Sequence, residues 1–163
     1  MRKRLPLSDE RGATAIEFAF IAPVMLAFVF AIIEVGVMGL MSNAFDTAVD
    51  YSARSIRTGQ SDGPATASAF KDGICAKMPS ALLDCRSRLN VSVRQFATFS
   101  ALAASAAGAP DGTFNKGVAG DIILVKATYR WPMLVPNFSM GVTNGTSEVV
   151  IDSRTTFKNE PYG

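Results

Sequence analysis

The residues of this chain that could do chemistry are few, and the most unusual is a glutamate beside a long apolar run. Glu17 stands in "RGATAIEFAFIAPVMLAFVFAIIE", residues 11–34, and no residue from Phe18 to Ile33 is charged. A carboxylate within a membrane costs about 2.5–3.5 kcal/mol near the bilayer centre and less near its edge. Glu17 is therefore either a solvated acid at a membrane edge or an acid with a specific partner.

The other reactive groups form no recognisable catalytic pattern. The chain has no histidine, so it lacks the commonest general base and the commonest neutral metal ligand. Its two cysteines lack the CxxC spacing of a zinc site. It has no GxSxG, HExxH, P-loop or GxGxxG motif. We therefore expect no enzyme activity, no cofactor, no bound metal and no small-molecule substrate.

The net charge of +2 belongs to the beginning of the chain. Of 16 basic and 14 acidic residues, four basic and two acidic ones lie in residues 1–12, which leaves 12 of each in residues 13–163. A nucleic-acid-binding domain usually shows a net excess of basic residues. The neutral remainder gives no support to nucleic acid as a partner.

The apolar run is long enough to cross a membrane. Phe18 to Met41 is 24 residues, about 36 Å as a helix against a hydrocarbon core of about 30 Å. It is longer than the core of a secretory signal peptide. Basic residues precede it, and the first charges beyond Glu34 are Asp46 and Asp50. The positive-inside rule then predicts a cytoplasmic N-terminus and places the chain after Met41 on the outer side of the membrane.

The helical pattern continues beyond the apolar run. Phe45, Ala48, Val49, Ser52 and Ile56 recur at helical spacing and predict one buried stripe. Gly59 is a natural stop for such a helix. We therefore expect one helix over residues 14–58, apolar in its first half and amphipathic in its second.

The rest of the chain predicts a small mixed domain. Apolar residues at helical spacing predict a short helix over residues 65–78. Alternating patterns predict strands near residues 89–94, 121–131 and 148–157. Residues 99–120 read as a long loop with a helical turn at 100–106, and "WPMLVPNF" reads as irregular. Non-helical connections between the strands favour an antiparallel sheet on the upper part of the long helix. The fold class is therefore α+β.

The order of features around Glu17 resembles the processing site of type IV pilin-like precursors. A basic leader is followed by "RG", four residues, "EF" and the apolar run. The resemblance implies that a prepilin peptidase cuts between Gly12 and Ala13 on the cytoplasmic side. Glu17 would then be the fifth residue of the mature chain. With Phe18 beside it, Glu17 would pair with the new α-amine of Ala13, or with that of a neighbouring subunit.

Within that superfamily the chain most resembles the TadE-like group of the tight-adherence (Tad) pilus system. The resemblance is carried by "GATAIEFAFIAPVML", by the acid Glu34 late in the span, and by "YRWPMLVP" and "RTTFKNEPY" near the end, where Lys158 stands in place of an arginine. It implies a pilin-like minor pilin or pseudopilin that acts in assembly of an adhesion pilus. Its partners would be the prepilin peptidase, other pilins and the Tad assembly proteins of the inner membrane.

The same resemblance divides the chain into four parts. These are a cytoplasmic leader (1–12), a transmembrane and assembly helix (13–41), a periplasmic extension of that helix (42–60) and a periplasmic α+β domain (61–163). The protein would be a single-pass inner-membrane protein, with entry into an extracellular pilus left open. Glu34 is then either an interfacial residue or a second polar contact with another helix.

Cys75 and Cys85 both lie in the part expected in the periplasm. An oxidising compartment favours a disulfide between them. The alternative is two buried free thiols.

Two other functions remain open from the sequence. One is a membrane-anchored periplasmic binding or sensing module unrelated to pili, and the other is a small anchored periplasmic enzyme. The mature N-terminus discriminates between these and a pseudopilin, because only a pseudopilin should begin at Ala13.

Overall fold

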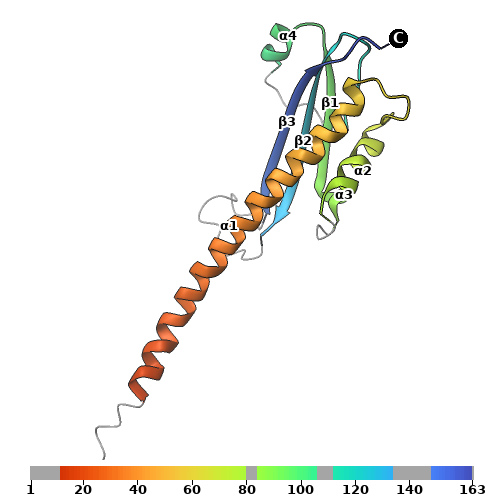
Figure 1. Cartoon of the computed structure of the whole chain (residues 1–163). Helices are drawn as coiled ribbons and strands as arrows, with labels where there is room; N and C mark the ends of the chain where they lie inside the picture. The colour runs from red at the N-terminus through yellow and green to blue at the C-terminus, as the bar shows by residue number, and fades with distance from the viewer. Residues whose placement is uncertain (1–11, 80–83, 106–111, 134–147, 163) are drawn as a thin grey trace, which may run out of the picture.

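One long helix runs along the molecule, and a small domain of three strands and short helices packs against its second half (Figure 1). The computed structural model describes residues 12–79, 84–105, 112–133 and 148–162. Its elements, in chain order, are α1 (Ala13–Arg57), α2 (Ala67–Lys77), α3 (Cys85–Arg88), β1 (Leu89–Phe96), α4 (Phe99–Ala104), β2 (Ile122–Pro132) and β3 (Glu148–Lys158). The predicted α+β class is confirmed.

Helix α1 is continuous over 45 residues and passes through Pro23 without ending. At its C-terminal end the N–H of Thr58 donates to the carbonyl of Arg54 over 3.0 Å. Gly59 then takes a left-handed conformation with φ of 62°, which glycine adopts without steric cost. The helix predicted over residues 14–58 and its stop at Gly59 are confirmed.

The three strands form one antiparallel sheet in the order β1-β2-β3. Val125 of β2 lies between Val93 of β1 and Thr155 of β3. The free edge of β1 is partly covered, because the N–H of Val93 donates to Thr113 and the N–H of Asn115 donates back to Val93. The three predicted strands and the helical turn after residue 99 are confirmed. Most of "WPMLVPNF", from residue 134, lies outside the described residues.

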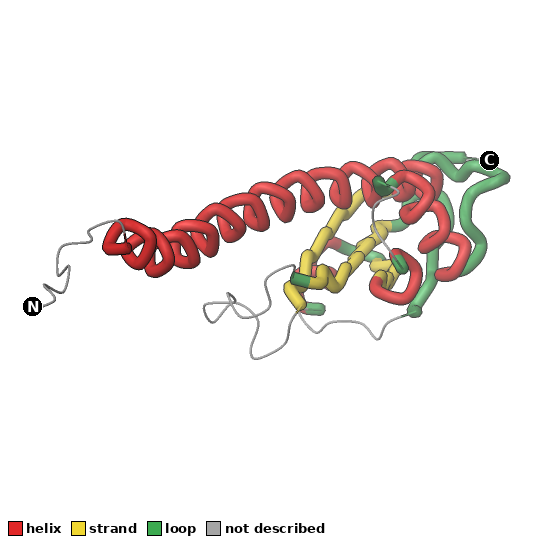
Figure 2. The backbone as a smooth tube through the Cα atoms, turned by 90° about the horizontal axis from the view of Figure 1, so that it is seen from below, coloured by secondary structure: helices red, strands yellow, loops and turns green. Residues whose placement is uncertain are grey.

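The core lies between the sheet and the upper half of α1, which form two layers (Figure 2). The predicted stripe of α1 is buried throughout, with Phe45 and Val49 at 0% exposure. It meets the odd-numbered residues of β2, which point to one face because side chains alternate along a strand. The rings of Phe45 and Tyr129 lie 6.1 Å apart. The alternating residues of β2 and the helical stripe of α1 thus form a single hydrophobic core.

Helix α2 lies beside α1 and completes the core with Phe70 and Ile74. Its N-cap is Thr66, whose hydroxyl accepts a hydrogen bond from the N–H of Ala69. The short helix α3 was not predicted, because four residues are too few to show a helical period. A disulfide joins Cys75 of α2 to Cys85 of α3, with their Cα atoms 5.9 Å apart. The predicted disulfide is therefore confirmed.

Candidate functional site

The first turn of α1 holds the residues that the sequence analysis placed at a processing site. Gly12 is the N-cap residue, and α1 begins at Ala13. Gly12 has a φ of −83°, and a Cβ built on it would meet nothing within 4 Å. The described structure therefore does not require a glycine at this position. A glycine that the fold does not need is consistent with recognition by another protein.

Glu17 lies one helical turn beyond Ala13 and is exposed. Residues four apart lie on the same face of a helix, about 6 Å apart along its axis. No acidic residue lies in the first turn itself, and no side chain caps the helix end. Glu17 is thus the first carboxylate of α1 and is placed on the same side as the backbone nitrogen of Ala13. A short reach would allow a positive charge at that nitrogen to pair with it.

The surface that follows Glu17 is almost wholly apolar and exposed. Phe18, Phe20 and Ile32 are 69%, 76% and 72% exposed. The most apolar 18-residue window in Thr14–Arg57 has a mean hydropathy of 2.5, and none of that window is buried in the chain. Burying one large apolar side chain away from water is favourable by about 1.5–3 kcal/mol. This single helix is compatible with single-pass membrane anchoring.

Two glycines near the end of the apolar part of α1 are not required by the structure of the described residues. A Cβ at Gly36 or Gly39 would meet nothing within 4 Å. Glycine inside a helix costs about 0.5–1 kcal/mol relative to alanine. Small residues in membrane helices allow a neighbouring helix to approach closely. Their presence fits a helix that packs against others.

Glu34 differs from its neighbours, because it is only 4% exposed while Ile33 and Val35 are 50% and 70% exposed. The chain itself covers this carboxylate. From the sequence, Glu34 is expected either at the membrane interface or against another helix. Its burial within one chain adds a contact that neither alternative included.

The C-terminal segment that carried part of the family resemblance ties the end of β3 to the end of α1. Asn159 is 2% exposed, and its side-chain amide donates to the carbonyls of Lys116 and Val118 over 2.9 and 3.0 Å. The N–H of Glu160 donates to the carbonyl of Arg57 over 2.9 Å. The Arg57 and Glu160 side chains also form a salt bridge of 3.4 Å.

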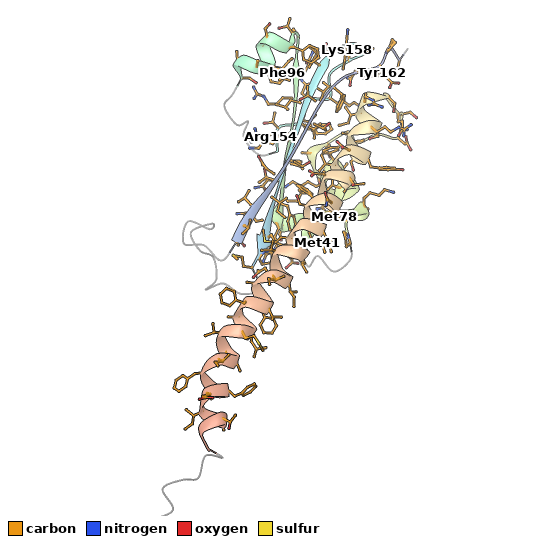
Figure 3. All side chains as sticks on the ribbon, turned by 60° about the vertical axis from the view of Figure 1, so that its left-hand side comes forward. Met41, Met78, Phe96, Arg154, Lys158 and Tyr162 are labelled. Carbon is orange, nitrogen blue, oxygen red and sulfur yellow. A yellow bond between two sulfur atoms is a disulfide. The ribbon has the colours of Figure 1, made fainter. Side chains whose placement is uncertain are left out.

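Tyr162 completes this closing segment and lies beside the end of α1 (Figure 3). Its ring occupies the place that a Cβ on Gly59 would take. Gly59 is therefore required twice, by its positive φ and by the tyrosine ring. The segment "RTTFKNEPY" and the stop at Gly59 are both evident in the sequence. Their contact could not be predicted, because nothing in the sequence pairs two segments about 100 residues apart.

The described residues contain no group of three or more histidine, cysteine, aspartate or glutamate side chains that could hold a metal ion. Among the aromatic residues, Tyr129 and Trp131 are core residues at 1% and 7% exposure. Tyr51 is 61% exposed, and the Lys77 ammonium lies 4.4 Å from the centre of its ring.

Comparison with known proteins agrees with the resemblance seen in the sequence. Residues 12–54 match the family model described as TadE-like protein. The match begins at Gly12 and ends just before the last turn of α1. It is consistent with a TadE-like protein of the Tad system. No curated protein and no solved structure matches the chain.

Proposed function

We propose that this chain, a TadE-like protein by the match over its first helix, is a minor pilin or pseudopilin that acts in assembly of a Tad-type adhesion pilus. The observation that carries the proposal is the apolar half of α1. Its large apolar side chains are exposed, and it begins after Gly12, a glycine that the described structure does not require. It continues without a break into the half of α1 that packs in the core of the outer domain. Such a helix needs either lipid or other helices around it.

The proposal includes processing. A prepilin peptidase cuts between Gly12 and Ala13 and removes residues 1–12 as a leader. The product has a free α-amine at Ala13 and equal numbers of acidic and basic residues. Residues 13–41 then form the transmembrane and assembly helix. Residues 42–60 extend it into the periplasm, where residues 61–163 form the outer domain.

Glu17 acts in assembly rather than in processing. A charged amine in a medium of low dielectric is costly unless it is paired. A subunit that enters a helical bundle buries its α-amine among apolar side chains. The Glu17 carboxylate of the same chain or of a neighbouring pilin offsets that charge, and Phe18 packs beside it. The pairing also fixes how far each helix slides along the next.

Mass analysis of the N-terminus tests the processing step. Protein extracted from membranes of cells with the peptidase should begin at Ala13. Replacing Gly12 with leucine should block the cut and leave a precursor twelve residues longer. An intact Met1 terminus in cells with active peptidase would contradict the proposal.

Glu17→Ala tests the assembly role separately. This variant should still be cut at Gly12, because the carboxylate lies beyond the bond that is cut. It should lose most pilus formation, counted by electron microscopy, whereas the matched variant Glu160→Ala at the outer tip should not. Normal piliation by Glu17→Ala would contradict the pairing role.

A membrane-anchored binding or sensing module is the second candidate. A cavity of about 470 Å³ lies between α1 and α2, and Tyr51, Phe70 and Lys77 are among its lining residues. Its size suits a small ligand. This function predicts no dependence on the peptidase, so the N-terminal mass analysis also separates the two candidates.

A further inference from the structure

The buried stripe of α1 continues from the core of the outer domain toward the N-terminal end of the helix. Met41 and Met38 follow Phe45 at helical spacing, are partly buried and pack against the core. Glu34 is the next residue on the same face, and it is 4% exposed. The chain therefore covers one face of α1 from Ile56 to Glu34.

The remaining surface of α1 is apolar and exposed over the same turns. Val35 and Leu40 are 70% and 71% exposed, and the first charged residue beyond Glu34 is Asp46. Large apolar side chains are more stable away from water. Over residues 35–41 the helix thus has one face against the outer domain and another face that suits lipid.

The levels of these residues along α1 match the thickness of a bilayer. Glu17, the acid at the start of the apolar run, marks the inner edge of the hydrocarbon core. Glu34 is then about 26 Å and Leu40 about 35 Å from Glu17, and a helix tilt of about 20° shortens both by only about 6%. The core is about 30 Å thick, and the bilayer with its headgroup layers is about 40–45 Å thick. Glu34 therefore lies within the outer edge of the core, and Leu40 lies in the outer headgroup layer.

One end of the sheet lies at the same level as Leu40. We call this end the lower end of the outer domain, and it consists of Trp131 and Pro132 of β2 with their partners Val149 and Glu148 of β3. Tyr129 packs against Phe45, which is about 42 Å from Glu17. Trp131 is about 7 Å nearer to the membrane, because the other end of the sheet lies beside the last turn of α1. Met41, next to Leu40, lies beside the lower end in Figure 3.

The level of Glu34 gives a physical reason for its burial. A carboxylate that faces lipid inside the hydrocarbon core is costly. Ile33 and Val35 are exposed on either side of it, whereas Glu34 lies on the face that carries the buried stripe. The covered face of α1 thus reaches below the outer edge of the core, and the acid at its lowest point is shielded from lipid.

We propose that the lower end of the outer domain rests in the outer headgroup layer of the membrane, with phospholipid as its partner. This contact rests on the membrane-anchored form of the proposed pilin. Because α1 is one continuous helix packed in the domain, the domain acts as a stop that fixes how deeply α1 enters the bilayer. The bond between Gly12 and Ala13, about 7 Å below Glu17, is then held at the cytoplasmic surface, where the peptidase cuts.

Depth-dependent quenching of fluorescence tests the contact. Trp131 is the single tryptophan, so the full-length chain in phospholipid vesicles carries its own reporter. One set of vesicles contains phosphatidylcholine brominated close to the headgroup, and a second set contains phosphatidylcholine brominated near the ends of the acyl chains. Bromine quenches only at short range. Trp131 should therefore lose most of its fluorescence in the first set and little in the second.

Two variants that also carry Trp131→Phe move the reporter to matched exposed positions. Pro132→Trp places it at the lower end, and Val118→Trp places it at the opposite end of the domain. Pro132→Trp should be quenched by bromine near the headgroup, and Val118→Trp by neither lipid. Absence of quenching at both Trp131 and Pro132→Trp would overturn the proposal. Equal quenching of Val118→Trp would overturn it as well, because the domain would then not rest on its lower end.

A third reporter separates failure of the contact from failure of the membrane anchor. Phe28→Trp, again with Trp131→Phe, lies about 16 Å from Glu17, near the centre of the bilayer. It should be quenched chiefly by bromine near the ends of the acyl chains. If it is quenched while the lower end is not, α1 spans the membrane, but protein or water surrounds the lower end and the proposal is overturned.

The N-terminal mass keeps this contact separate from the pilin function. A chain that is cut at Gly12 but is not quenched at its lower end would overturn the contact and leave the pilin function intact. Quenching at the lower end of a chain that keeps its leader would support the contact and contradict the processing.

Discussion

The two halves of α1 share one backbone but have different surroundings. In the upper half, the stripe that contains Phe45, Val49 and Ile56 is buried at 0–3% exposure. In the lower half, Phe20, Ile21 and Val24 are as apolar and yet 76%, 64% and 58% exposed. The helix is continuous across the boundary. Its formation therefore does not depend on which surroundings its side chains find.

The difference between the two halves indicates where the apolar side chains of each half are shielded from water. A helix satisfies its backbone hydrogen bonds internally, which makes it stable in lipid as well as against a sheet. The upper half meets its partner within the chain, as Figures 1 and 2 show. The apolar side chains of the lower half are exposed in the described chain. They can leave water only against lipid or against another chain. Substitutions in the two halves should accordingly affect different properties.

The largest difference is expected for a large-to-small change in each half. Phe45→Ala should lower the free energy of unfolding of the outer domain by about 3–5 kcal/mol, because it leaves a cavity beside Tyr129. Phe20→Ala should change it by less than about 0.5 kcal/mol. Urea titration of the full chain in detergent measures both, with the fluorescence of the single tryptophan, Trp131, as the signal. Equal effects would mean that the halves are not independent.

The disulfide should come next in size. The bond closes a loop of sequence separation 10, and restricting the unfolded chain over that loop contributes about 2.7 kcal/mol. Reduction should lower the urea midpoint of the outer domain accordingly. It should leave the helicity of the lower half of α1 unchanged by circular dichroism. In the variant with both Cys75 and Cys85 replaced by serine, reductant should have no further effect.

The same glycine-to-alanine change should have different effects at Gly59, just beyond the C-terminal end of α1, and at Gly39, within the helix. Gly59→Ala should destabilise the outer domain by about 2 kcal/mol, since alanine at positive φ is strained and would displace the Tyr162 ring. Gly39→Ala should leave the domain unaffected and add helix propensity. The urea midpoints of both variants measure this. A neutral Gly59→Ala would show that the contact of the closing segment with α1 is unimportant.

The smallest effect is a pH dependence in the outer domain. Partial burial raises the pKa of Asp152, but hydrogen bonds from Arg154 and Thr128 outweigh it, so the carboxyl of Asp152 keeps a pKa below its usual value in the folded protein. Its ionised form therefore adds stability above the unfolded pKa of about 3.9, and this stability is lost as pH falls through the folded pKa. Urea midpoints from pH 7 to pH 3 should fall less steeply in Asp152→Asn than in the unmodified chain. Parallel curves would contradict this assignment.

Much of the fold could be predicted because its signals are local. The buried stripe of α1 and the alternating residues of β2 each repeat at the period of one element, and both predictions are confirmed. The short helix α3 gave no signal, since it is shorter than two turns. At the candidate site, Gly12, Ala13 and Glu17 were identified through the resemblance to pilin-like precursors, and their role in processing and assembly stays a prediction.

What escaped prediction was contact between distant segments. The sequence by itself determined one long helix, its apolar half, the three strands and the pairing of Cys75 with Cys85, because these depend on neighbours within a few turns or on the only two thiols present. Only the tertiary structure decided that Tyr162 lies against Gly59 and that Glu34 is buried. Register and layer order bring those residues together, and neither is encoded at a fixed spacing.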